Sequence, residues 1–204
     1  IDDKHLSYTV RYSSRSVNLV NEAEADILMF SNRMWRYSCT SGNLTQISFP
    51  EDRKGNSNLF HIGSTEEGTW FHDAHSIFLL PYGASELHIK GCTDNVNIRC
   101  GDFSDDGLIW LATEEGICRF NPKVGFFDFI KTALFPSAGS IACAGSSLVW
   151  VGPDVGLCAY LPDTGSFAMF GESDGAPSIE YLNKPRMKTD KGEAYTGGVD
   201  GLLR

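Results

Sequence analysis

Long apolar runs, closely spaced cysteines and positive charge are all scarce in this sequence of 204 residues. No apolar run approaches the ~20 residues that a membrane-spanning helix requires. The six cysteines, at positions 39, 92, 100, 118, 143 and 158, include no Cys-x-x-Cys pair, which argues against a structural zinc site. With 17 basic and 26 acidic residues, the formal charge is −9, which argues against nucleic acid and other polyanions as partners.

The local signatures of nucleotide and hydrolase sites are missing as well. There is no P-loop, no Gly-x-Gly-x-x-Gly opening a helix and no Gly-x-Ser-x-Gly elbow. Useful helical periodicity is also missing, whereas 42% hydrophobic and 21% charged residues are typical of a folded globular protein. We therefore expect a folded chain that uses no cofactor.

Internal repeats indicate the architecture. The segments 106–120 and 147–160 match each other, with Trp110 and Trp150 in the same place. The same frame extends to five anchors, separated by 43, 40, 40 and 45 residues: Ile27, Trp70, Trp110, Trp150 and Tyr195. A period near 42 residues with four short strands per unit is typical of β-propeller blades.

Apolar residues recur at fixed distances after each anchor. Eight residues after it lie Trp35, Phe78, Cys118, Cys158 and Leu203, and ten after it lie Tyr37, Leu80, Phe120 and Tyr160. Positions that alternate in this way line one face of a strand. We therefore expect Cys118 and Cys158 to be buried, unlinked thiols, and the four tryptophans to pack between blades: Trp35, Trp70, Trp110 and Trp150.

Glycines mark turns in the third, fourth and fifth units, and Asp106-Gly107 is a strong hairpin signal. In the third unit the expected strands are about 96–100, 108–113, 117–121 and 126–130. The sequence thus predicts an all-β propeller of four-stranded antiparallel blades in one domain, 1–204. Its repeats fall at about 13–49, 57–90, 95–130, 139–170 and 177–204.

The stretches from Asp106 to Pro122 and from Lys191 to Leu203 resemble two-component regulator propeller repeats. The resemblance implies the periplasmic sensor region of a bacterial hybrid two-component system, a class of regulator that commonly detects oligosaccharides. The first two repeats depart from the pattern, with Arg33 and Ser76 in place of a turn glycine. No kinase or receiver motif is present, so the resemblance concerns the sensor part alone.

Two views of ring closure follow. Residues 6–12 are similar to the last strand of a blade, so we expect them to pair with 200–204 and close a five-bladed ring. Propellers of the family usually have seven blades, and on that view the chain is a fragment of a larger ring.

The candidate ligand site lies where loops from different blades meet. Its residues are on the loops between second and third strands: His72, Asp73, His75, Glu114, Glu115 and Asp154. The segments leading into first strands, 51–56, 93–95 and 172–174, are expected on the same face. Within this set we expect His72 and His75 to hydrogen-bond ligand hydroxyls, with Trp70 as a stacking face if it is accessible.

Metal binding and catalysis have little support at these positions. Two nearby imidazoles suit zinc, but the segment offers no third ligand, so we expect no metal. The expected innermost strands carry a single carboxylate, Glu180, whereas glycosidases need a pair. We therefore expect no catalytic residues.

The function that we expect is extracytoplasmic, periplasmic sensing of an oligosaccharide or other small polar ligand by a receptor. The acidic balance favours a neutral or cationic ligand. The membrane would be reached only through other parts of the receptor. A protein-interaction module and, less favoured, a five-bladed glycoside-processing enzyme are the alternatives. Homodimer formation and a disulfide between Cys92 and Cys100 are left open.

Overall fold

The computed structural model describes residues 16–21, 26–30, 34–51, 59–153, 156–175, 181–188, 194–198 and 201–203. These residues form five antiparallel sheets, four of four strands and one of three. Among them there is no α-helix, and thus none with the length and hydropathy that crossing a membrane requires. The all-β class predicted from the sequence is confirmed.

In every sheet the strands follow one another in chain order. The first sheet contains β1 (Ser16–Asn21), β2 (Asp26–Phe30), β3 (Met34–Ser38) and β4 (Leu44–Ile47). The second contains β5 (Phe60–Thr65), β6 (Gly68–His72), β7 (Ser76–Pro81) and β8 (His88–Cys92). The third contains β9 (Ile98–Phe103), β10 (Ile109–Thr113), β11 (Gly116–Asn121) and β12 (Phe126–Ile130). The fourth contains β13 (Ala138–Ala144), β14 (Leu148–Pro153), β15 (Leu157–Leu161) and β16 (Ser166–Phe170). The fifth contains β17 (Tyr181–Lys188), β18 (Ala194–Gly198) and β19 (Gly201–Leu203).

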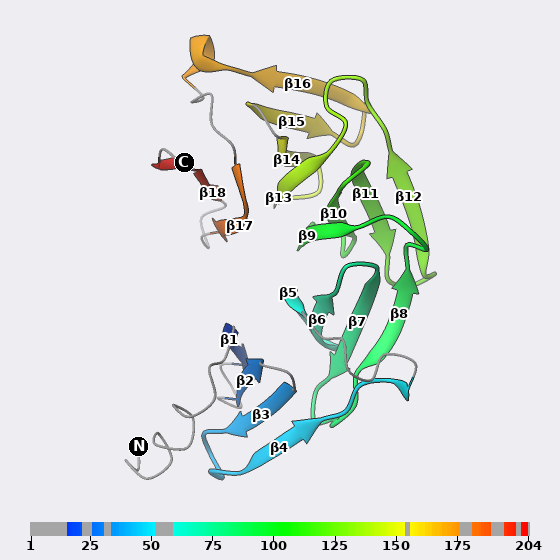
Figure 1. Ribbon diagram of the computed structural model, residues 1–204, viewed down its shortest axis with the longest axis vertical. Coiled ribbons are helices and arrows are strands. Elements are labelled where there is room, and N and C mark those ends of the chain that lie inside the picture. The colour runs from blue at the N-terminus through cyan, green and yellow to red at the C-terminus, as the bar shows by residue number, and fades with distance from the viewer. Residues whose placement is uncertain are drawn as a thin grey trace. The chain divides into compact units, whose positions relative to one another are not determined.

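The chain divides into two compact units. The first comprises Ile1–Asp73 and Ile77–Ile89, and the second comprises Ala74–Ser76 and Lys90–Arg204. Within the second unit the first strands β9, β13 and β17 lie side by side (Figure 1). A hydrogen bond joins β13 to β9: the Cys143 amide donates to Asp102 Oδ2 at 2.8 Å.

The strands of the third repeat match their predicted positions closely, with one difference. The last strand, β12, has the predicted bounds, and β10 and β11 differ from them by one residue. The first strand, β9, begins two residues later than predicted and ends at Phe103. The reason is that residues 93–97 form a loop whose hydrogen bonds go to other loops.

A register irregularity occurs between the first and second strands of every sheet. In the third sheet, Ala112 faces Cys100 and Thr113 faces Ile98, so Arg99 is the extra residue in β9. Bulges of this kind increase local twist and change the direction of a side chain. Arg99 is thereby placed near the loop that precedes β9.

Aromatic side chains pack between two sheets of the second unit. Trp110 on β10 is buried, and its ring centroid lies 5.5 Å from that of Tyr160 on β15. Both belong to a buried cluster that includes Ile117, Val149 and Val151. Trp150 is only half-buried and packs against Phe170 at 5.7 Å. The predicted aromatic contact between blades is confirmed for Trp110.

The first unit has a cluster of its own, which includes Met34, Ile47, Phe71 and Phe78. Trp70 is buried with 1% of its surface exposed, and its indole nitrogen donates to Thr65 Oγ1 at 3.0 Å. Trp35 is half-buried. The burial expected for Trp70 is therefore confirmed, and it leaves no face of the ring accessible for stacking on a ligand.

All six cysteines are free thiols. Cys118 and Cys158 are buried, as the column of apolar residues predicted. Burial raises the pKa of Cys118 to about 12 and that of Cys158 to about 11. Cys92 is exposed and Cys100 is buried, and no disulfide joins them. Residues 6–12, which were predicted to pair with 200–204 and close a five-bladed ring, lie outside the described residues.

We expect Trp110→Ala to lower the free energy of unfolding by about 3–5 kcal/mol, because it removes a fully buried ring from between two sheets. Urea unfolding of the chain measures this loss. Phe126→Ala is the matched control, since 64% of the Phe126 surface is exposed, and it should change stability by no more than about 0.5 kcal/mol. Equal losses for the two variants would contradict the packing role of Trp110.

Thiol labelling with Ellman's reagent at pH 8 should separate two groups of cysteines. Cys39 and Cys92 are exposed and should react quickly. Cys118 and Cys158 should react only after unfolding. Burial keeps the reagent from these thiols, and their raised pKa values leave little of the reactive thiolate at pH 8. Rapid labelling of Cys118 in the folded chain, detected by mass spectrometry, would show that the face of the third sheet that carries Cys118 is exposed to solvent.

Candidate functional site

Loops of the third sheet meet at one end of its strands. Successive turns alternate between the two ends of an antiparallel sheet in chain order. Residues 93–97, which lead into β9, and the turn at Glu114–Glu115 between β10 and β11 therefore share an end. The turns at 104–108 and 122–125 lie at the other end.

Hydrogen bonds tie residues 93–97 to the loop between β6 and β7. The Thr93 amide donates to the His75 carbonyl at 2.8 Å, and the Ile98 amide donates to the Ala74 carbonyl at 2.7 Å. His75 Nδ1 donates to the Val96 carbonyl at 3.3 Å. The Thr93 hydroxyl donates to Val96 and His75 carbonyls at 2.5 and 3.2 Å. The two loops therefore hold each other in place.

The same segment is tied to Glu114. The Asn97 amide N–H donates to Glu114 Oε1 at 3.1 Å, and the Asn97 side-chain amide donates to Oε2 at 3.0 Å. In return, the Glu114 amide donates to the Asn97 carbonyl at 3.1 Å. We call Ala74–His75, residues 93–97 and Glu114–Glu115 the loop cluster. All of it belongs to the second unit.

The turn that carries Glu114 and Glu115 depends on a glycine. Gly116 has a φ of +112°, a conformation that residues with a Cβ rarely adopt. A Cβ at this position would also lie 3.0 Å from the Ile130 carbonyl oxygen. Thr113 supports the turn from the other side, because its hydroxyl donates to the Gly116 carbonyl at 3.0 Å. The turn can therefore present its two carboxylates in a defined orientation.

Glu114 is held in its ionised form. The side-chain hydrogen bond from Asn97 is the largest cause of its lowered pKa, followed by the backbone hydrogen bond from Asn97. Partial burial opposes this shift, while the Arg99 guanidinium and the His75 imidazole add smaller lowering effects. The loop cluster thus combines a fixed carboxylate, an amide and an imidazole, which together can donate and accept hydrogen bonds.

The loop before β13 has one contact with β9 and one with the loop cluster. Arg99 Nη1 donates to Ser137 Oγ at 3.4 Å. Lys131 Nζ pairs with Glu115 Oε2 at 2.5 Å, although both side chains remain accessible to solvent. An exposed ion pair of this kind adds little stability, so its main effect is to position the two side chains.

His72 contradicts the prediction that it contacts a ligand. It is the last residue of β6 and has only 1% of its surface exposed. It lies opposite Phe60 on β5 and Ile77 on β7, and its ring centroid is 5.2 Å from that of Phe60. The predicted loop was placed one residue too early, because β6 extends through His72. Trp70, on the same strand, is likewise too buried to stack on a ligand.

The other predicted residues have varied positions. His75, Glu114 and Glu115 are in the loop cluster, and Asp73 lies half-buried beside it in sequence. Asp154 and residues 52–56 lie outside the described residues, while Glu51 is exposed. Residues 172–174 form the 3-10 helix η2, whose Asp174 accepts a bond from the Gly171 amide. The described residues hold no group of three or more His, Cys, Asp or Glu side chains arranged for a metal ion.

The pairing of Asn97 with Glu114 was not predicted, although Glu114 was among the candidate site residues. It follows from the register of β9 and β10, since Thr113 faces Ile98 and the next residue outward on each strand is Glu114 or Asn97. The loop before β13, with Lys131 and Ser137, was also missed. This loop could have been found from its place in the repeat, because it leads into the first strand of a sheet as residues 93–97 do.

Glu114→Gln tests the ionised state of Glu114 through the pH dependence of stability. A carboxyl whose pKa is lowered on folding stabilises the folded state above its unfolded pKa, near 4.3. That contribution is lost as the pH falls through the lowered pKa of the folded state. We therefore expect wild type to exceed the variant in stability at pH 6 and to lose this advantage as the pH approaches 3, as measured by urea unfolding across this range. A difference independent of pH would contradict the ionised pairing with Asn97.

No protein-family model matches the chain, and no curated protein matches its sequence. A streptogramin B lyase structure is similar to it with a TM-score of 0.57 and 13% identity, covering 91% of this chain and 74% of the lyase. The fold by itself therefore does not distinguish a sensor from an enzyme.

Two extracellular domains from B. thetaiotaomicron are also similar in structure. The extracellular domain of the putative one component system BT4673 gives a TM-score of 0.68 at 16% identity, over 92% of this chain and 26% of that one. The extracellular domain of the putative hybrid two component system BT3049 gives a TM-score of 0.65 at 13% identity. The match covers 93% of this chain and 28% of that one. This chain spans about a quarter of each. The resemblance found in the sequence is thus confirmed for the fold: the chain folds as a β-propeller similar to the extracellular domains of these systems.

Proposed function

We propose that this chain is the ligand-sensing propeller part of an extracytoplasmic signalling receptor. Its ligand is an oligosaccharide or another small polar molecule, bound at the loop cluster. The observation that carries the proposal is the set of hydrogen bonds that holds His75, Asn97 and Glu114 together at one end of the strands. Polar groups fixed in advance on a packed scaffold bind a ligand without the cost of ordering them.

The loop cluster suits binding better than glycoside hydrolysis. A glycosidase needs a general acid whose pKa is raised, so that it is protonated at neutral pH. The pKa of Glu114 is lowered, chiefly by the Asn97 side chain. An ionised carboxylate of this kind accepts hydrogen bonds from ligand hydroxyl or ammonium groups. We therefore propose that the chain binds its ligand without chemical conversion.

The proposed location is the periplasm, and it is supported by the extracellular domains to which the fold is similar. The net charge of −9 favours neutral or cationic ligands over sulfated or uronic polymers. Attachment to a membrane would come from other parts of the receptor.

Isothermal titration calorimetry of the chain with cellotetraose, xylotetraose, mannotetraose and trigalacturonate tests the proposal. We expect a neutral oligosaccharide to bind, trigalacturonate to bind more weakly, and chromatography to find no cleavage products. The double variant His75→Ala with Asn97→Ala should reduce affinity at least tenfold, because it removes two hydrogen-bonding groups from the loop cluster.

Lys123→Ala is the control, because Lys123 is exposed in the turn at the other end of the third sheet. It should bind as wild type does. Equal affinities for the double variant and wild type, with both folded, would remove the loop cluster from the site. Turnover of any oligosaccharide would favour the enzyme alternative, and a complete lack of binding would favour the protein-interaction alternative.

A further inference from the structure

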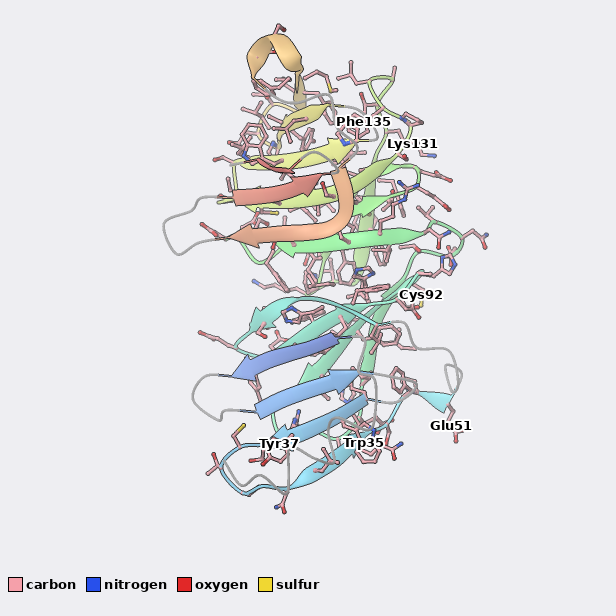
Figure 2. All side chains as sticks on the ribbon, turned by 60° about the vertical axis from the view of Figure 1, so that its left-hand side comes forward. Trp35, Tyr37, Glu51, Cys92, Lys131 and Phe135 are labelled. Carbon is pink, nitrogen blue, oxygen red and sulfur yellow. The ribbon has the colours of Figure 1, made fainter. Side chains whose placement is uncertain are left out.

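A second loop contacts the loop cluster at Glu115. This loop, Lys131–Ser137, precedes β13 and begins with the Lys131 that pairs with Glu115. It ends with Ser137, which accepts a hydrogen bond from Arg99. Figure 2 shows Lys131 and Phe135 on the same side of the second unit as Cys92, which directly precedes the loop cluster segment 93–97. The loop therefore lies beside the proposed site and contacts it at Glu115.

The loop is firmly anchored between its ends. Phe135 has 4% of its surface exposed, and its ring packs edge-to-face on Phe167 with a centroid separation of 5.8 Å. The Leu134 amide donates to Thr132 Oγ1 at 3.2 Å, and Ser137 is 7% exposed. Phe135 thus provides the apolar anchor that the loop needs.

Leu134 takes no comparable part in the core. Its side chain is 53% exposed, and the neighbouring Ala133 and Pro136 are exposed as well. We call Ala133, Leu134 and Pro136 the apolar tip. A single exposed leucine is ordinary, but three uncharged apolar residues on an anchored loop beside a polar cluster form a surface of mixed character. Ligand sites commonly combine apolar contact area with a few fixed polar groups.

We infer that the apolar tip is the second wall of the ligand site and that Leu134 determines specificity within it. The inference rests on the proposed function and adds the character of the ligand. A pyranose whose hydroxyls are equatorial has a polar edge and two faces of C–H groups. The polar edge pairs with Asn97, Glu114 and His75, and a C–H face covers Leu134. The site therefore prefers saccharides with equatorial hydroxyls, such as β-linked glucose or xylose chains.

Calorimetric titration of Leu134→Ser and Leu134→Ala with cellotetraose and xylotetraose tests this inference. Each variant should lose affinity about fivefold, because about half of a leucine side chain is no longer covered on binding. Leu134→Met, which keeps the apolar volume, should bind within twofold of wild type. Wild type should bind cellotetraose and xylotetraose more tightly than mannotetraose, in which the 2-hydroxyl is axial.

Val124→Ser is the matched control, since Val124 is 71% exposed in the turn at the other end of the third sheet. It should leave affinity unchanged. Wild-type affinity in both Leu134→Ser and Leu134→Ala, with thermal unfolding unchanged, would overturn the inference while leaving the proposed function intact. Tighter binding of mannotetraose by wild type would also overturn it. If wild type bound none of the oligosaccharides, the inference would fall together with the oligosaccharide as the proposed ligand.

Discussion

Burial of both faces of a sheet is the constraint on which this structure depends. In the third sheet, β10 is buried along its whole length, and Trp110 contacts Tyr160 of the next sheet. A sheet that is apolar on both faces is stable only when neighbouring sheets cover them. The repeat of about 40 residues supplies such neighbours, each with an aromatic or apolar residue in the equivalent place. The same packing makes Cys118 and Cys158 inert small hydrophobic residues.

Because burial of the sheet faces stabilises the fold, the loops at the strand ends are available for function. The loops at one end of the third sheet have polar side chains whose hydrogen bonds go to other loops. Asn97 and Glu114 come from adjacent strands, and His75 comes from a different hairpin. Since each of these side chains already has a hydrogen-bond partner within the loop cluster, none has to be ordered when a ligand arrives. The bulge in β9 adds Arg99 to the same region.

Because the fold is similar both to the extracellular domain of a putative one component system and to a lyase, the function has to be argued from the loops. Here the lowered pKa of Glu114 is informative, because it distinguishes an acceptor of hydrogen bonds from a proton donor. The apolar tip beside it is informative in another way. An anchored loop with Phe135 inside and Leu134 outside separates the residue that stabilises the loop from the residue that is available for contact.

Period and alternation were sufficient to predict the four-stranded blades, the burial of Trp110 and the buried thiols, because these depend on the spacing of apolar residues along one chain. The sequence also placed His75 and Glu114 on loops of the same face. It could not place His72, whose burial depends on β6 continuing for one residue between β5 and β7. Nor could it pair Asn97 with Glu114 or join Arg99 to Ser137, which lie 17 and 38 residues apart. Those contacts depend on strand register and on how neighbouring loops meet, and only the tertiary structure decides them.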